Sequence, residues 1–262
     1  MRERAIELVK NRPLSTDGRH LLREHLQSRI LGVLHARGAR APLVSTGGTA
    51  LRFVYRQPRF CDVLDFTLER EDSEFSLGTL IERVKRQLEQ QGYETEARVE
   101  EGVIVRAVLG FPGILAASGL SPYTDESLTV ALEVGTRPVV GATDDVTLVH
   151  HFGRLRLHHH DLPSLFAGKI TTVVERSHVT GRDLYDLMWY LSWRPVIEPS
   201  RAVLDNMGGG LSDEWRHALK ERLEAVDWDQ ARKSVAPLLE RPRDLELLDA
   251  MTLAHLLAES AL

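Results

Sequence analysis

Two glycines and two carboxylates between residues 43 and 66 are the residues best suited to chemistry. Gly47 and Gly48 follow one apolar run, and a second apolar run carries Asp62 and Asp65. Glycines after a strand let the backbone N–H groups of a helix start approach a phosphate, because they lack a Cβ and the helix dipole favours negative charge. Carboxylates on the next strand can hold a magnesium ion. This order predicts a phosphate bound beside a metal ion.

Two blocks of sequence carry a resemblance to a known family. Residues 46–51 read Thr-Gly-Gly-Thr-Ala-Leu, and residues 59–66 read Arg-Phe-Cys-Asp-Val-Leu-Asp-Phe. This first block resembles the nucleotidyltransferase superfamily and, more narrowly, the AbiEii/MenT family of bacterial toxin nucleotidyltransferases. The second block begins with Lys-Ile-Thr-Thr at 169–172 and continues with Arg-Asp-Leu-Tyr-Asp-Leu at 182–187, which is similar to the corresponding lysine and Arg-Asp-x-Tyr-Asp-Leu segments of that family.

The resemblance runs from about residue 43 to about residue 191 and implies a fold. We expect the α+β class, with a nucleotidyltransferase-like mixed sheet and flanking helices followed by a helical C-terminal domain. The expected domains are a catalytic domain at 1–160 and a helical domain at 161–262.

Position 63 departs from the family pattern. The family usually reads Arg-Phe-Ser-x-Asp-Leu-Asp-Phe, whereas here Val63 replaces the first Asp and Asp62 lies one residue earlier. Because successive side chains of a strand point to opposite faces, Asp65 shares a face with residue 63, and Asp62 points away unless a bulge intervenes. Two interpretations stay open: an active enzyme in which a bulge returns Asp62 to the metal, or a weakened or non-catalytic relative.

The resemblance implies transfer of a nucleoside monophosphate from an NTP to a hydroxyl, with Mg²⁺ or Mn²⁺ as cofactor. The expected metal ligands are Asp62, Asp65 and Glu133. The expected catalytic residues are these three acids with Lys169 and Asp186. The expected nucleotide-binding residues are Gly47, Gly48, Thr49, Arg52, Arg59, Lys169, Arg182 and Asp183.

Two of these assignments have a structural alternative. Glu133 has the order and spacing of a third carboxylate that can take a proton from the attacking hydroxyl, but single acids on edge strands commonly face solvent. Lys169 is expected to face the triphosphate, where its charge would stabilise the transfer. A salt bridge from Asp186 to Lys169 or to an arginine would explain the same residues.

The same resemblance implies partners. The acceptor can be the 3′ end of tRNA, but self-modification or another RNA acceptor is equally compatible with these residues, and a cognate antitoxin is expected. The competing class is a non-catalytic family member that binds nucleotide or RNA or serves as an interaction module. A metal hydrolase built on the histidines at 150–151 and 158–160 is a third class, but consecutive histidines point in different directions. A loop beside the active cleft is the simpler interpretation of these histidines.

Composition sets outer bounds. The chain has 262 residues, of which 27% are charged and 43% belong to the AVILMFWYC set, as in ordinary globular proteins. No run reaches the roughly 18–20 apolar residues of a membrane span, and no apolar signal core follows the start. A cytoplasmic protein without a membrane partner is therefore expected. The single cysteine, Cys61, excludes an internal disulfide and a thiolate zinc cluster and is expected to be a buried thiol.

The charge is uneven although its sum is only −5. Residues 1–40 carry nine Lys or Arg against four acids. Such a segment could steer a polyanionic RNA, or it could be a solvated helix surface.

Periodicity predicts the elements that would position these residues. Strands are expected at 43–46, 63–68 and 128–134, with a hairpin formed by 93–99 and 103–111. Helices are expected at 19–36, ended by Gly38, at 49–55, and from Leu77 to Gln91-Gly92. After residue 160 the pattern is helical, with Asp161 or Ser164 as a cap, clear helices at 211–226 and 245–257, and a hinge or cap at the three glycines 208–210.

Overall fold

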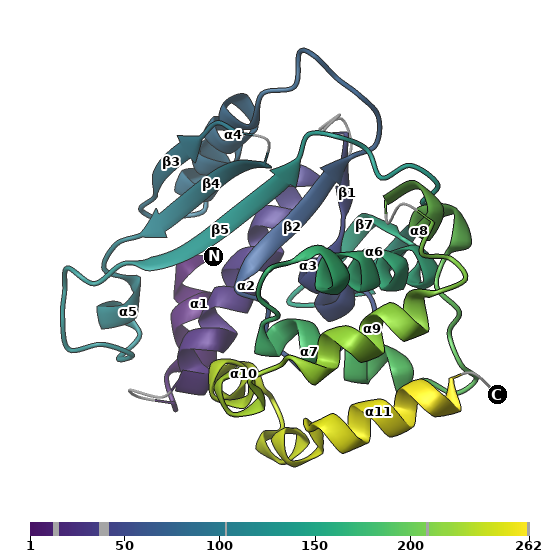
Figure 1. Ribbon diagram of the computed structural model, residues 1–262. Coiled ribbons are helices and arrows are strands. Elements are labelled where there is room, and N and C mark those ends of the chain that lie inside the picture. The colour runs from purple at the N-terminus through teal and green to yellow at the C-terminus, as the bar shows by residue number, and fades with distance from the viewer. Residues whose placement is uncertain (13–15, 37–41, 103, 208–209, 261–262) are drawn as a thin grey trace. The chain divides into compact units, whose positions relative to one another are not determined.

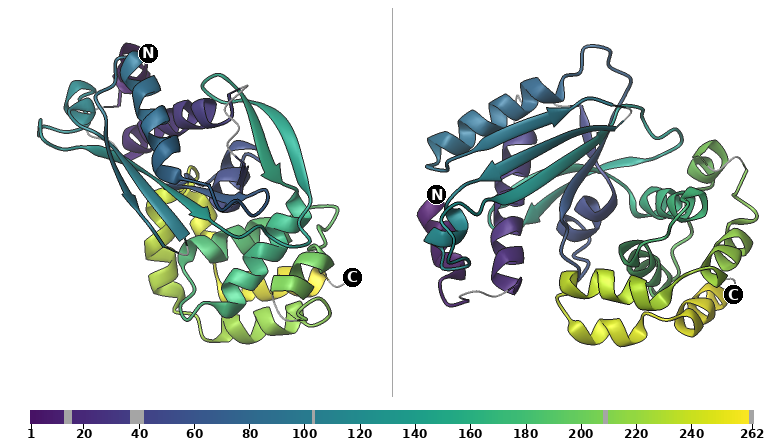
Figure 2. Two further views of the ribbon diagram at one scale, coloured as in Figure 1. Left: turned by 90° about the horizontal axis from the view of Figure 1, so that it is seen from above. Right: turned by 60° about the vertical axis from the view of Figure 1, so that its left-hand side comes forward.

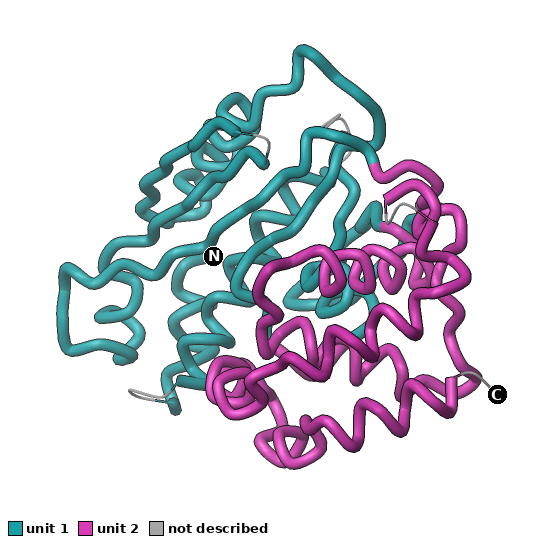
Figure 3. The backbone as a smooth tube through the Cα atoms, viewed as in Figure 1, with its two compact units in different colours: residues 1–56, 60–138, 146–159 teal, residues 57–59, 139–145, 160–262 magenta. Residues whose placement is uncertain are grey.

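The computed structural model describes all residues except 13–15, 37–41, 103, 208–209 and 261–262 (Figures 1 and 2). It divides into two compact units, which are coloured separately in Figure 3. Unit 1 comprises Met1–Arg56, Phe60–Pro138 and Val146–His159. Unit 2 comprises Gln57–Arg59, Val139–Asp145 and His160–Leu262. The long segment of unit 2 begins at His160, and two short earlier segments also belong to this unit.

One mixed sheet contains the strands found among the described residues. Its order is β3-β4-β5-β2-β1-β7-β6, and β2 lies in the middle, parallel to β5 and antiparallel to β1. This arrangement confirms the predicted α+β class with a mixed sheet and flanking helices. The strand bounds are β1 Leu43–Ser45, β2 Val63–Leu68, β3 Glu96–Glu100, β4 Ile104–Phe111, β5 Leu128–Gly135, β6 Asp144–His150 and β7 Arg154–His160.

The helices of unit 1 supply its core. Leucines and isoleucines spaced along α2 and α4 are fully buried in one cluster with alternate side chains of β2, β4 and β5. These two helices cover one face of the sheet. Burying each such side chain is worth about 1.5–3 kcal/mol, and this burial fixes the register of the strands, because a slip of one residue would expose the buried side chains. The helix bounds are α1 Arg2–Val9, α2 Thr16–Leu34, α3 Gly47–Phe53, α4 Leu77–Gln90 and α5 Ile114–Ala117.

Unit 2 is mainly helical, and its caps are visible in the sequence. Asp161 accepts a hydrogen bond from the Ser164 N–H at the start of α6, and Thr180 forms a capping box with Asp183 at the start of α7. The helix bounds are α6 Leu162–Glu175, α7 Gly181–Leu191, α8 Arg201–Met207, α9 Trp215–Glu224, α10 Trp228–Val235 and α11 Ala250–Glu259, with 3₁₀ turns at Ala236–Leu238 and Pro242–Leu247. No helix in the described part of the chain is long and apolar enough to cross a membrane.

Several predicted elements differ from the structure. His150 ends β6 and the histidines at 158–160 lie in β7, so the interpretation of these residues as a loop was wrong, whereas His151 does lie in the turn between the strands. The predicted helix at 245–257 is interrupted, because Asp249 caps a new helix that begins at Ala250. The predicted helix at 211–226 is shorter and spans Trp215–Glu224. Gly38, Gly208 and Gly209 lie outside the described residues.

Two helical glycines in unit 2 provide a matched test of this packing. A Cβ on Gly181 in α7 would overlap the carbonyl oxygen of Ala231 in α10, whereas a Cβ on Gly168 in α6 would meet nothing within 4 Å. Gly181→Ala should therefore lower the free energy of unfolding by about 1–3 kcal/mol through overpacking. Gly168→Ala should leave it unchanged or raise it by up to about 1 kcal/mol, because alanine favours helix. Urea denaturation measures both, and equal stability of the two variants would contradict the close packing of α7 on α10.

Candidate active site

Asp65 and Glu133 occupy directly paired positions on neighbouring parallel strands. In the ladder between β2 and β5, Asp65 pairs with Glu133 and Val63 pairs with Ala131. Leu64 is fully buried in the core with the side chains of α2, whereas Asp65 and Glu133 are only partly buried. Because side chains alternate along each strand, both carboxylates lie on the sheet face opposite α2 and α4.

Arg106 extends this row onto β4. It pairs with Glu133 in the antiparallel ladder, and its Nε lies 3.7 Å from the Glu133 Oε1. About half of the Arg106 side chain is exposed, so the ion pair is weak and its arginine can turn to another anion. Arg106 was not among the residues predicted from the sequence, because its position beside Glu133 follows only from the pairing of β4 with β5.

The start of α3 approaches the Asp65 carboxylate closely. Gly47 has a φ of +48°, and a Cβ at this position would lie 3.0 Å from the Asp65 Oδ2. The Asp65 N–H donates to the Thr49 hydroxyl at 2.7 Å, and the Thr46 N–H donates to the Asp65 carbonyl at 2.9 Å. Glycine is therefore required at position 47, both for its backbone conformation and for the space beside Asp65. Thr49 itself is buried, so its hydroxyl holds the strand in place.

Asp62 lies before the first residue of β2. Its Oδ1 is 3.5 Å from Nη1 of Arg23 on α2, and the ladder of β2 with β5 runs without interruption from Val63 to Thr67. The described ladder therefore contains no bulge that would return Asp62 to the face of Asp65. No group of three or more His, Cys, Asp or Glu side chains placed to hold a metal ion occurs within the described residues.

The pair Asp65 and Glu133 still suits magnesium. Mg²⁺ is usually held by one or two carboxylates together with water and substrate phosphates. Two acidic side chains at paired strand positions, on the less buried face of the sheet, supply that number of ligands. The donor set therefore fits Mg²⁺ with two carboxylates, and Asp62 is not brought together with them.

Arg52 is committed to a buried ion pair within unit 1. Its guanidinium pairs with Glu24 of α2, with 3.1 Å between Nη2 and Oε2, and its Cζ lies 4.9 Å from the ring centre of Phe60. Burial opposes ionisation of Glu24, but His151, at 3.4 Å, and Arg52 outweigh it and lower the pKa of Glu24. Arg52 therefore holds α3 against α2. Sequence reasoning gave Glu24 no role.

Lys169 lies in a charged cluster inside unit 2. Its Nζ is 3.0 Å from the Asp183 Oδ1 and 3.0 Å from the Asp186 Oδ2. Asp186 also accepts hydrogen bonds at 3.0 Å from the Arg59 Nε and from the Gln57 Nε2. The salt bridge predicted from Asp186 to Lys169 or an arginine is thus present with both partners.

The electrostatics of this cluster follow from its burial. Removal from water opposes charge on Lys169, but the carboxylates of Asp186 and Asp183 outweigh this and raise the pKa of Lys169. Burial would likewise raise the pKa of Asp186, but Arg59 and Lys169 outweigh it and lower that pKa. The pKa of Asp183 is also lowered, with burial again outweighed, first by Lys169 and then by the Thr180 hydroxyl. All three groups are held in their charged forms.

The other residues that were predicted to bind the nucleotide have separate surroundings in the structure. Asp183 closes the capping box of α7 and pairs with Arg176 at 3.1 Å in addition to Lys169. Arg182 is exposed, and Gly48 is buried in the first turn of α3. Asp183 therefore has a structural role, whereas the side chain of Arg182 reaches solvent.

The histidines of β7 have separate partners. His159 Nε2 lies 2.9 Å from the Thr147 hydroxyl, and His160 Nδ1 lies 2.6 Å from the Asp144 Oδ1. These interactions hold strand β7 to strand β6. These hydrogen-bond partners account for the positions of His159 and His160 without a metal ion.

Comparison with known proteins identifies a matching family. The family model described as "Nucleotidyl transferase AbiEii toxin, Type IV TA system" matches residues 29–251. No curated protein matches this sequence.

Two solved structures have a similar fold. The nucleotidyltransferase toxin MenT4 from Mycobacterium tuberculosis H37Rv is 17% identical, with a TM-score of 0.65, over 99% of this chain and 88% of that protein. JHP933 from Helicobacter pylori is 19% identical, with a TM-score of 0.56, over 92% of this chain and 91% of that protein. At these identities the likeness concerns the fold.

Removing the charge of Asp186 should destabilise unit 2. Asp186→Asn leaves the buried cations Arg59 and Lys169 without full compensation, and breaking a buried pair in this way costs about 3–5 kcal/mol. The matched control is Asp213→Asn, which removes an exposed partner of Arg201 and should change stability by no more than about 0.5 kcal/mol. Denaturant unfolding followed by circular dichroism measures both. Equal effects would show that Asp186 does not hold the cluster together.

Proposed function

This chain belongs to the AbiEii family of nucleotidyltransferase toxins of type IV toxin–antitoxin systems, and we propose that it transfers a nucleoside monophosphate from an NTP to an RNA hydroxyl. The hydroxyl oxygen bonds to the α-phosphorus, the bond between the α- and β-phosphates breaks, and pyrophosphate leaves. The hydroxyl proton passes to a base or to solvent.

The observation that carries this proposal is the pair Asp65 and Glu133 beside the close approach of Gly47. A divalent ion held by these carboxylates would neutralise the triphosphate and lower the pKa of the attacking hydroxyl. Gly47 keeps the side of Asp65 open, so that phosphate oxygens can share the site with that carboxylate. Glu133 is only partly buried and would accept the proton.

Arg106 would support binding of the triphosphate. In the structure it pairs with Glu133 at 3.7 Å with both side chains partly exposed, and a phosphate could offer its guanidinium bidentate, charge-assisted hydrogen bonds. When the NTP binds, Arg106 can move to the phosphates and leave Glu133 to act as ligand or base. The family role of Lys169 as a triphosphate contact stays part of this proposal, beside its ion pairs with Asp183 and Asp186.

The acceptor we propose is the 3′ end of tRNA. Its terminal ribose offers a hydroxyl on an accessible single strand, and a nucleotide added there would block aminoacylation, which accounts for toxicity. A cognate antitoxin protein is the partner that a type IV toxin requires. The structure of MenT4, a nucleotidyltransferase toxin, has a similar fold and is consistent with this class of reaction.

One observation favours a second function. Asp62 pairs with Arg23 on the α2 side of the sheet. Val63 lies on the same face as Asp65, at the position where the family has an acid. A chain with only two metal-binding carboxylates could bind nucleotide or RNA without transferring it. The following variants separate the two functions.

Asp65→Asn should reduce nucleotide transfer by about 10² to 10³-fold, the order found when one stabilising group is removed from an active site. Asp62→Asn should change the rate only a few-fold, because Asp62 faces α2. Purified protein is incubated with total tRNA, Mg²⁺ and each labelled NTP in turn, and the label entering RNA is measured. Transfer that needs Asp62 as much as Asp65 would contradict the assigned faces, and no transfer with any NTP would favour the non-catalytic function.

Val63→Asp should raise the rate of transfer. An aspartate at this position would lie on the face of Asp65, beside Ala131, and add a third carboxylate to the pair. Since a metal ligand can contribute several kcal/mol, we expect an increase of about tenfold or more in the same assay. Val63→Asn has nearly the same shape without the charge and should give no increase. Equal rates for the two variants would show that the missing acid does not limit this site.

A further inference from the structure

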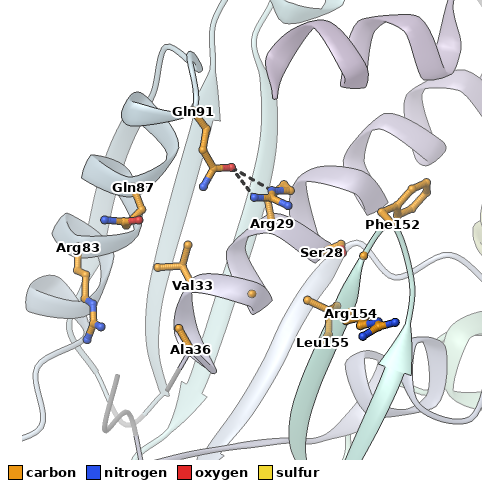
Figure 4. A pocket seen from close by; sticks show the side chains of 12 residues that line it. Ser28, Arg29, Val33, Ala36, Arg83, Gln87, Gln91, Phe152, Arg154 and Leu155 are labelled. Atoms are coloured by element: carbon orange, nitrogen blue, oxygen red, sulfur yellow. Dashed lines mark hydrogen bonds between the residues drawn. The ribbon is translucent and has the colours of Figure 1, made fainter. Parts of the chain in front are cut away.

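Unit 1 contains a cavity with a volume of about 430 Å³ that is lined by three arginines (Figure 4). Arg29 comes from α2, Arg83 from α4, and Arg154 from the start of β7. The size lies within the range of small-ligand sites. Because the three cations come from separate elements, the folded structure gathers a positive charge that no single element carries.

Arg29 is held in position by a neutral partner. Its Nε and Nη2 both donate to the Gln91 Oε1, at 3.0 and 2.8 Å, as Figure 4 shows. These hydrogen bonds orient the guanidinium, but an amide does not compensate its charge. Arg29 is therefore fixed before any ligand arrives, which reduces the entropy that binding would cost.

No acidic side chain lines this cavity among the described residues. Arg29, Arg83 and Arg154 also form no ion pair with a carboxylate within the described part of the chain. Elsewhere in unit 1, Arg19 pairs with Glu126, Arg23 with Asp62, and Arg52 with Glu24. The cavity is thus lined by three like charges, with no acidic side chain among the described residues that line it.

The cavity is separate from the proposed transfer site. Its lining includes residues of α2 and α4, and these helices cover the sheet face on which Leu64 lies. Asp65 and Glu133 lie on the opposite face. A triphosphate bound beside Asp65 cannot fill it, because the sheet lies between them.

We propose that this cavity is a second binding site, for a phosphate ester group. Guanidinium groups bind phosphate oxygens through paired, charge-assisted hydrogen bonds, and two of them are enough to compensate the charge of one phosphate. The side-chain amides of Gln87 and Gln91 and the ring of Phe152 also line the cavity and can contact an attached sugar or base. The phosphate comes either from the backbone of an RNA strand or from a free nucleotide. This inference does not rest on nucleotide transfer.

The test compares two double variants of equal charge. Arg83→Gln with Arg154→Gln removes two of the lining cations. The control, Arg86→Gln with Arg156→Gln, changes exposed arginines of the same helix and the same strand that do not line the cavity. Binding to a labelled single-stranded RNA and, separately, to ATP is measured without divalent metal, so that transfer does not occur.

The cavity variant should bind one of these probes at least about tenfold more weakly than the control, since a hydrogen bond to a charged group is worth about 1.5–3 kcal/mol. A loss confined to RNA identifies the RNA backbone as the source, and a loss confined to ATP identifies a free nucleotide. Equal affinities of the two variants for both probes would overturn the proposal, as would the absence of binding by the unmodified protein.

A second measurement uses the unmodified chain and does not depend on folding of the variants. Phenylglyoxal modifies accessible arginines, and mass spectrometry reports each site. The bound probe should protect Arg83 and Arg154 and leave Arg86 and Arg156 reactive. Protection of neither cavity arginine, under conditions where the probe is bound, would place the ligand elsewhere.

Discussion

Alternation of side chains along β2 is the constraint on which the candidate active site depends. β2 lies between β5 and β1, and its buried residues Leu64 and Phe66 pack with α2. A slip of one residue would bury Asp65 and expose these side chains, at a loss of about 1.5–3 kcal/mol for each of them. The hydrophobic core therefore decides which face Asp65 occupies, and the same rule sends Asp62 toward α2.

Unit 2 depends on a different kind of interaction. Asp186 is nearly inaccessible and accepts from Arg59, Gln57 and Lys169, so one carboxylate joins α6, α7 and the short segment Gln57–Arg59. The Glu240 N–H donates to the Pro58 carbonyl and adds a backbone contact to this segment. A residue set that resembles a substrate-binding motif in sequence thus also determines which part of the chain belongs to this unit.

Patterns confined to one element could be predicted from the sequence, whereas partners brought together by the fold could not. The bounds of β2 and the Asp161 cap follow from alternation and local hydrogen bonding, whereas the mixed sheet was expected from the family resemblance. The β6–β7 hairpin was missed because its histidines hide the alternation of residues such as Leu155 and Leu157. Nothing local signals that Arg52 pairs with Glu24, or that Glu133 faces Arg106, because these contacts link distant segments.

In the folded chain, part of the positive charge of the first forty residues is compensated by acids from elsewhere in the sequence. The sequence has an excess of basic residues there, but Arg19 pairs with Glu126 and Arg23 with Asp62, two acids that lie outside this segment. Counting charge along the sequence therefore overstates the positive surface that α2 can present. Arg29 differs, because its partner Gln91 is neutral and the other cations near it come from α4 and β7. Positive charge is thus concentrated at the cavity, where a protein of net charge −5 can attract a phosphate despite its overall charge.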